Sequence, residues 1–110
     1  MRFLMELGIT ANYKGYWYLL TALRLLTLEQ LHTIRVTGDL YPRIARQHGV
    51  SAQSVERSIR TAIEACWGCG NRELLRRLCP GSHRPTNATF IAALVVTLYI
   101  SGRDDPSASL

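Results

Sequence analysis

The sequence predicts an all-α fold, a compact bundle of about six helices in one domain. No segment alternates apolar and polar residues with the period of two that is typical of a half-buried strand. Apolar residues recur instead at helical spacing. Tyr16, Leu19, Leu20 and Leu23 stand at positions i, i+3, i+4 and i+7, which share one face of a helix. Glycine and proline residues fall between such segments and mark their ends.

Two helices are predicted at the start of the chain. A short helix covers Arg2 to Leu7 and stops at Gly8, because glycine readily adopts a left-handed cap. A second helix runs from about Tyr13 to Leu26. The stretch from Leu28 to Thr37 has mixed character, and the spacing of its apolar residues suggests only a helical turn or two.

The third helix is predicted to begin at Asp39, whose side chain is suited to an N-cap. This start places Pro42 in the first turn. Proline is tolerated there, because amide groups of the first turn make no hydrogen bond within the helix. The helix continues to His48 and ends at Gly49.

Three more helices are expected in the second half. Ser51 caps a long helix that Gly68 and Gly70 end. One apolar stripe follows it, made of Val55, Ile59, Ala62, Ile63, Cys66 and Trp67. A short helix covers Arg72 to Leu78, two prolines interrupt the next loop, and Asn87 is expected to cap the final helix.

The domain is expected to comprise residues 1–100. Residues 101–110 are short, polar and interrupted by Gly102 and Pro106, so they are expected to form a flexible C-terminal tail. We find no internal repeat and no low-complexity linker.

The charge balance favours an anionic partner. Thirteen Lys and Arg against eight Asp and Glu give a net charge of +5, and twelve of the thirteen cations are arginine. Arginine is the side chain best shaped for bidentate contacts to phosphate and guanine. A positive charge can also serve only to keep a small protein soluble, so charge alone leaves the partner open.

The sequence predicts a cytoplasmic protein with no membrane anchor. The start, MRFLMELGIT, lacks an apolar run long enough for a signal peptide. The most apolar stretch, Phe90 to Ile100, is about half the length that crosses a bilayer. Three cysteines without a secretory signal fit a reducing compartment in which thiols stay free.

The segment IARQHGVSAQSVERSI meets several steric requirements of a helix-turn-helix at once. A small residue, Ala45, stands where the two helices cross, and Gly49 follows where the turn requires a positive φ. Val50 is expected to fill the turn, and Val55 and Ile59 to pack back on the first helix. The alternative is an ordinary helical hairpin with a glycine turn and a serine cap.

We expect the helix from Ser51 to Trp67 to read the major groove of double-stranded DNA. The residues on its outward face are Gln53, Ser54, Glu56, Arg57, Arg60, Thr61 and Glu64. Arg57 and Arg60 can each offer two donors to guanine or one to a phosphate. Glu56 can accept from cytosine, Gln53 can pair with adenine, and the amides at the Ser51 cap can bind a phosphate. A solvated ladder of i, i+4 ion pairs is the alternative reading of this face.

Four blocks of sequence, in one order, resemble the C-terminal effector domain of the sporulation initiation response regulators of spore-forming Firmicutes, the stage 0 sporulation protein A family. The blocks are KGYWYL from Lys14, LYPRIA from Leu40, SVERSIRTAIEACWGCGN from Ser54, and RPTNATFIA from Arg84. The resemblance covers nearly the whole chain.

What this resemblance implies is a six-helix transcription factor domain that binds as a dimer to short repeated promoter boxes. By matching position, Glu56, Arg57 and Arg60 are similar to the recognition-helix contacts of the family. Arg84 is similar to a basic residue that touches DNA from the loop before the last helix. Ser54 stands where the family typically has an arginine.

Full-length members of the family carry a receiver domain ahead of this one, for which 110 residues leave no room. The chain is therefore expected to be either an excised effector domain or a stand-alone relative. A receiver domain and RNA polymerase are the further partners that the resemblance suggests. The stretch from Phe90 to Ile100 is apolar almost all round, so it is expected either to be covered by the domain core or to contribute to a homodimer.

Two other classes of protein compete with a DNA-binding domain. Cys66, Cys69, Cys79 and His83 have the spacing C-x2-C-x9-C-x3-H, whose first pair suits zinc. Cys66 also lies on the apolar stripe, where cysteine commonly acts as a small hydrophobe, so we expect no metal and no cofactor. A helical protein-interaction module is the other alternative.

An enzyme is not expected. His32, His48 and His83 are far apart in the sequence. No glycine-rich phosphate loop and no paired-carboxylate motif accompanies them.

Overall fold

The fold places one long helix beneath the others. The computed structural model describes residues 2–26 and 36–104, and in these residues six α-helices and one π-helical turn occur without a strand. The elements are α1 (Arg2–Leu7), α2 (Lys14–Leu25), η2 (Val36–Leu40), α3 (Tyr41–His48), α4 (Ala52–Cys69), α5 (Arg72–Leu78) and α6 (Asn87–Asp104). The all-α prediction is confirmed.

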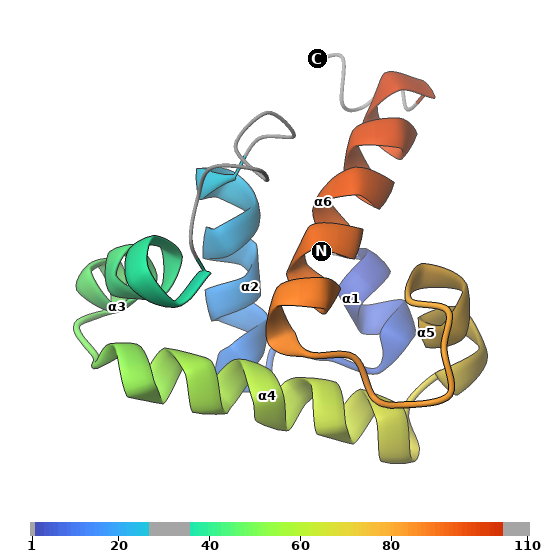
Figure 1. Cartoon of the computed structure of the whole chain (residues 1–110), viewed down its shortest axis with the longest axis horizontal. Helices are drawn as coiled ribbons and strands as arrows, with labels where there is room; N and C mark the ends of the chain where they lie inside the picture. The colour runs from blue at the N-terminus through green and yellow to red at the C-terminus, as the bar shows by residue number, and fades with distance from the viewer. Residues whose placement is uncertain (1, 27–35, 105–110) are drawn as a thin grey trace.

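Helix α4 is the base on which the other helices pack (Figure 1). α2 and α6 cross over it, α3 lies at its N-terminal end and α5 at its C-terminal end. Four of these helices contact α4 directly, with α2 and α3 contacting it most extensively. One face of α4 is therefore buried, and the opposite face lies along the edge of the molecule.

The core takes buried side chains from all six α-helices. Its largest fully buried side chains include Phe90, Leu4, Leu7, Leu19, Ile59, Ile63, Ile91 and Leu94. The predicted apolar stripe of α4 is buried except for Trp67, which is partly exposed. Burial of this stripe against several helices is the main source of stability that fixes α4 in place.

The crossing of α2 over α4 depends on Gly15. A Cβ atom at this position would lie 2.5 Å from the carbonyl oxygen of Ser58 and 2.9 Å from the Cβ of Ala62. No side chain larger than hydrogen fits, so the two helix backbones approach as closely as they can.

The boundaries of α1, α2 and α5 agree with the sequence prediction to within one residue. The end of α4 does not agree fully. Gly68 lies inside the helix, and only Gly70 stands at the C-cap, where its amide donates to the carbonyls of Ala65 and Cys66. Of the stretch predicted at Leu28 to Thr37, residues 28–35 lie outside the described residues.

The prediction that Asp39 caps α3 is wrong. Asp39 lies within η2, and Leu40 at the N-cap position has φ −71° and ψ −51°, which are helical angles. Because helical backbone runs from η2 directly into α3, the non-helical angles that a capping residue needs do not occur there. Pro42 does lie in the first turn of α3, as predicted.

The prediction that Asn87 caps α6 is also wrong. Asn87 is the first helical residue, and the hydroxyl oxygen of Thr86 accepts from the amide of Thr89 at 3.2 Å. Thr86 therefore takes the capping position, and the Asn87 side chain is used for other contacts.

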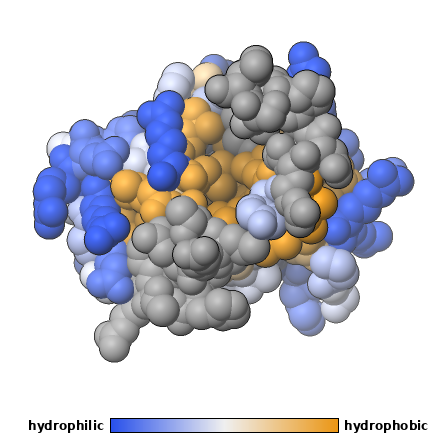
Figure 2. Space-filling view, turned by 90° about the horizontal axis from the view of Figure 1, so that it is seen from above, coloured by the Kyte–Doolittle hydropathy of each residue, from blue (hydrophilic) through white to orange (hydrophobic). Residues whose placement is uncertain are grey.

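Helix α6 continues to Asp104, past residue 100 at which we expected the domain to end. Phe90, Ile91, Leu94 and Val95 in its first half are buried, whereas Val96, Tyr99 and Ile100 are 39%, 47% and 58% exposed. In the view from above, apolar residues gather at the centre of the face toward which α6 runs (Figure 2). None of the described helices is long and apolar enough to cross a membrane.

Candidate nucleic-acid interface

Helices α3 and α4 form the predicted helix-turn-helix. Gly49 ends α3 with φ 67° and ψ 35°, a left-handed conformation that costs any residue with a Cβ atom strain. The amide of Val50 then donates to the carbonyl oxygen of Ala45 at 3.0 Å and closes the turn. The predicted glycine corner is confirmed.

Ser51 caps α4, also as predicted. Its backbone is extended, and its hydroxyl oxygen accepts from the amide of Ser54 at 3.1 Å. The Ser51 hydroxyl in turn donates to the Ser54 hydroxyl at 3.0 Å. These bonds fix the start of α4.

The packing between α3 and α4 agrees with the prediction at three positions and differs at one. Ala45, Val55 and Ile59 are buried. Val50 is 38% exposed and does not fill the turn. The ring of His48, at the end of α3, contacts α2: it lies 2.7 Å from the Thr21 hydroxyl oxygen and packs edge-on against Tyr18.

Val50 instead lines a surface groove of about 420 Å³ beside the turn. The other lining residues are Lys14, Trp17, Tyr18 and His48. The Trp17 ring is half exposed, and its Nε1 donates to the carbonyl oxygen of Ala11 at 3.0 Å. The lining of this groove is mostly apolar, and Lys14 adds one cationic group.

The structure brings the predicted reading residues to one exposed surface. Ser54 and Glu56 are partly exposed, and the remaining members of the set are exposed: Ser51, Gln53, Arg57, Arg60, Thr61 and Arg84. All of them except Arg84 lie on α4 or at its cap. Arg84 comes from the loop before α6 and reaches the same helix.

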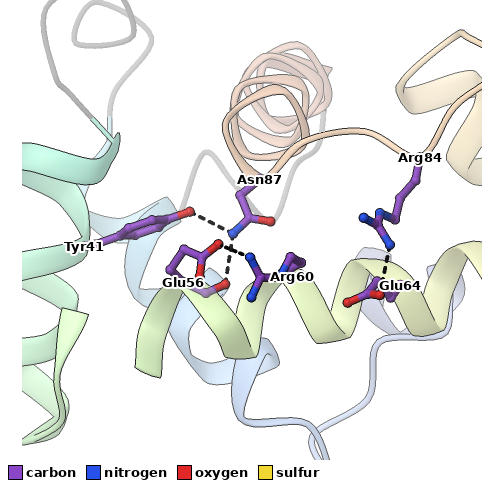
Figure 3. Close-up of polar contacts among 6 residues, drawn as sticks. All are labelled: Tyr41, Glu56, Arg60, Glu64, Arg84 and Asn87. Carbon is purple, nitrogen blue, oxygen red and sulfur yellow. Dashed lines mark hydrogen bonds and ion pairs between the residues drawn. The ribbon is translucent and has the colours of Figure 1, made fainter. Parts of the chain in front are cut away.

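Two ion pairs order this surface (Figure 3). Arg60 Nη1 lies 2.7 Å from Glu56 Oε1, one turn earlier on α4. Arg84 Nη1 lies 2.9 Å from Glu64 Oε2. Among the described residues no ion pair holds Arg57, which is exposed and follows Glu56 on α4.

The sequence did not identify Asn87 as a residue that contacts α4 beside this surface. Its Nδ2 donates to the hydroxyl oxygen of Tyr41 at 2.8 Å and to the main-chain oxygen of Glu56 at 3.0 Å. The only sequence signal was its place in the RPTN block with Arg84, where its residue type favoured helix capping.

A hollow of about 240 Å³ lies between α4 and the start of α6. The residues around it are Glu56, Arg60, Arg84, Pro85, Thr86 and Asn87. Two guanidinium groups and one carboxylate thus border the same small space. The hollow is therefore cationic, and the carboxylate of Glu56 offsets part of the positive charge.

The cysteines do not form the zinc site that their spacing suggested. Cys66 is buried and its thiol donates to the carbonyl oxygen of Leu7 at 3.1 Å, whereas Cys69 is exposed. Burial, followed by the neighbouring Cys79, raises the pKa of the Cys66 thiol to about 11. Within the described ranges no group of three or more His, Cys, Asp or Glu residues is placed to hold a metal ion.

Comparison with known protein families agrees with this architecture. The family described as "Sporulation initiation factor Spo0A C terminal" matches residues 1–98. The match includes the helix-turn-helix, the loop that carries Arg84 and most of α6. The chain therefore belongs to the Spo0A C-terminal family, the DNA-binding effector domains that regulate transcription at the initiation of sporulation.

Proposed function

We propose that this domain is a sequence-specific transcription regulator that reads the major groove with α4, from its cap at Ser51 to Trp67. The observation that carries the proposal is the outward face of α4, which presents polar and cationic side chains directly behind a capped helix-turn-helix corner. Such a face is sterically open to the edges of base pairs.

The exposed side chains suit different contacts. Arg57 is the candidate for a bidentate contact to guanine, because no intramolecular ion pair competes for it in the described part of the chain. Gln53 lies near the start of α4 and suits adenine, whereas Thr61 lies further along the helix. The amides of Ala52 and Gln53 suit a backbone phosphate, because in the first turn it is the amide of Ser54 that donates to the Ser51 cap.

Glu56 and Arg60 are proposed to act as a coupled pair. The 2.7 Å ion pair limits the positions that the Arg60 guanidinium can take. Arg60 can then contact a phosphate or guanine with one edge while Glu56 holds the other. Arg84, held by Glu64, is proposed to contact the phosphate backbone from the loop before α6.

Selection from random duplexes tests this proposal. The purified domain should enrich a short consensus, and its affinity for that duplex should fall steeply as salt is added. Arg57→Ala should lower affinity for the selected duplex, whereas Arg76→Ala, which removes the same charge from an exposed position on α5, should not. No enrichment at low salt would reject the proposal.

We propose in addition that two copies bind to paired boxes through the exposed part of α6. Val96, Tyr99 and Ile100 are large apolar side chains with substantial exposure on one helix. Sedimentation of the complex on a two-box duplex should give two copies per duplex. A complex with one copy at saturating protein concentration would reject dimerisation.

Protein interaction is a second candidate function, and the groove beside the turn favours it. Its half-exposed Trp17 is held by a hydrogen bond, which makes it a rigid apolar contact. A receiver domain or RNA polymerase in the cytoplasm is the proposed kind of partner. Binding through this groove should depend weakly on salt, in contrast to DNA binding, and should be lost in Trp17→Ala.

A further inference from the structure

We propose that Asn87 is a positioning residue for DNA recognition, which holds α4 in register with α3 and α6 and thereby sets where Arg60 is presented. The inference rests on the proposed function, because it assigns a role in reading DNA to a residue that does not itself face the outward side of α4.

The geometry is a single side-chain amide between three helices (Figure 3). Asn87 stands at the start of α6, and its Nδ2 donates to Tyr41 on α3 at 2.8 Å and to Glu56 on α4 at 3.0 Å. An amide nitrogen has two hydrogens in fixed directions. Both hydrogens are satisfied together only when the three helices keep one arrangement.

Burial strengthens this contact. Tyr41 is 3% exposed and Asn87 is half-buried, so water is a poor substitute for a lost partner. Desolvation by burial raises the pKa of the Tyr41 hydroxyl, and the hydrogen bond from Asn87 acts in the opposite direction. The Tyr41 hydroxyl therefore stays neutral at physiological pH, and its oxygen remains available to Asn87.

Neither α4 nor α6 needs the hydrogen bonds of Asn87 in order to form. Thr86 already caps α6 through the amide of Thr89. The carbonyl oxygen of Glu56 has two lone pairs, so it accepts from Asn87 without leaving the hydrogen-bond pattern of α4. What the Asn87 amide adds is the relative placement of helices that would form without it.

The point of attachment connects this placement to the DNA-facing surface. Glu56 receives Asn87 on its main chain and holds Arg60 with its carboxylate at 2.7 Å. A shift of α4 at Glu56 therefore moves the guanidinium of Arg60 directly. The same shift would reach Arg57, one residue along the chain.

The test uses Asn87→Ala, with Asn71→Ala as the matched control. Asn71 caps α5 through the amide of Leu74 at 3.1 Å, so its loss removes one side-chain hydrogen bond away from α3 and α6. Both variants are studied at a temperature where circular dichroism shows them folded. The probe is the duplex that the wild-type domain selects from a random pool, together with single-base variants of it.

Asn87→Ala is expected to reduce discrimination between the selected duplex and its variants by about tenfold, which is within the range of one bidentate base contact. Asn71→Ala should leave discrimination unchanged. Tyr41→Phe keeps the buried ring and removes one of the two acceptors, so it should give an intermediate loss. It also provides a second variant if Asn87→Ala does not fold.

A second readout uses the free protein. In nuclear magnetic resonance spectra, the Nε–Hε signal of Arg60 should move in Asn87→Ala toward that of an unrestrained arginine, and should stay in place in Asn71→Ala. Unchanged discrimination and an unchanged Arg60 signal in a folded Asn87→Ala would overturn the positioning role. Failure of the wild-type domain to select any duplex is a different result, and it rejects the proposed function itself.

Discussion

The guanidinium of Arg60 is bound to the carboxylate of Glu56 at 2.7 Å, while Arg57, exposed three residues earlier on the same helix, has no such partner among the described residues. The two arginines therefore differ in the free energy that a new contact with DNA requires. Arg57 loses only its contacts with water, whereas Arg60 must share or break an existing ion pair. This difference leads to separate expectations for each cationic residue of the surface.

Arg57→Ala is expected to weaken binding to the selected duplex by about 1 to 3 kcal/mol, because it removes a bidentate contact to guanine. Fluorescence anisotropy on the selected duplex and on a duplex with that guanine replaced measures the effect. Wild type and variant should bind the replaced duplex almost equally. A loss of the same size on every duplex would instead assign Arg57 to a phosphate.

Glu64→Gln is expected to tighten binding to all duplexes, because it releases Arg84 and removes one negative charge beside the DNA-facing surface. Arg84→Ala should have the opposite effect and lower the slope of log affinity against log salt by about 1. Affinities measured over a range of salt concentrations give both slopes. An Arg84→Ala effect confined to one base sequence would contradict the phosphate assignment.

Three glycine-to-alanine substitutions should distinguish backbone strain at a positive φ from a steric clash between two helices. Gly49→Ala should cost about 1 to 2 kcal/mol, because a Cβ there meets nothing within 4 Å and only the positive φ opposes it. Gly15→Ala should cost more than about 2 kcal/mol, because its Cβ would meet the backbone of Ser58. Gly68→Ala, in open space inside α4, should stabilise by about 0.5 to 1 kcal/mol. Urea unfolding of the four proteins gives the order, and an equal loss at Gly15 and Gly49 would be inconsistent with it.

The exposed Cys69 should be alkylated by iodoacetamide at pH 8 long before Cys66. The reactive species is the thiolate, and Cys66 is buried with a pKa raised to about 11, so its thiolate is rare at this pH. Mass spectrometry of peptides at successive times measures the order. Early modification of Cys66 in folded protein would show that the contact to Leu7 does not persist in solution.

Cys66 should also make stability depend on alkaline pH. The pKa of its thiol is raised in the folded state, from 9.0 to about 11, so the folded state keeps a proton that the unfolded chain loses. The stability that Cys66 contributes is therefore complete below pH 9 and decreases as the pH rises toward 11. Urea unfolding of wild type and Cys66→Ala should give a difference that shrinks over this range. A constant difference would refute the linkage.

Local patterns were sufficient to predict most of the fold. Gly49 and Ser51 act through their own backbone and immediate neighbours, so their roles follow from residue type and spacing. The apolar stripe of α4 follows from helical periodicity for the same reason. The family resemblance supplied Arg84, which no local pattern marks.

The errors arose where neighbouring residues compete for one position or where distant parts of the chain meet. Thr86 and Asn87 are both suited to cap a helix, and only the folded contact with Tyr41 explains why Asn87 does not. Val50 was expected to fill the turn, but it is exposed and lines a surface groove, and His48 contacts Thr21 on α2, 27 residues away in the sequence. The pairing of Glu64 with Arg84 is likewise decided by tertiary structure.

The tight passage of α2 over α4 at Gly15 has a consequence for how the domain could diversify. α2 packs against the inner face of α4 so closely at Gly15 that no methyl group can be added there. The solvent-facing side of α4 takes no part in this close contact. Its residues can therefore be exchanged without a change in the fold. Under the proposed function, domains with this crossing could therefore acquire new promoter preferences through changes at a few solvent-facing positions of α4, and a designer could transfer those positions to another domain of the same fold.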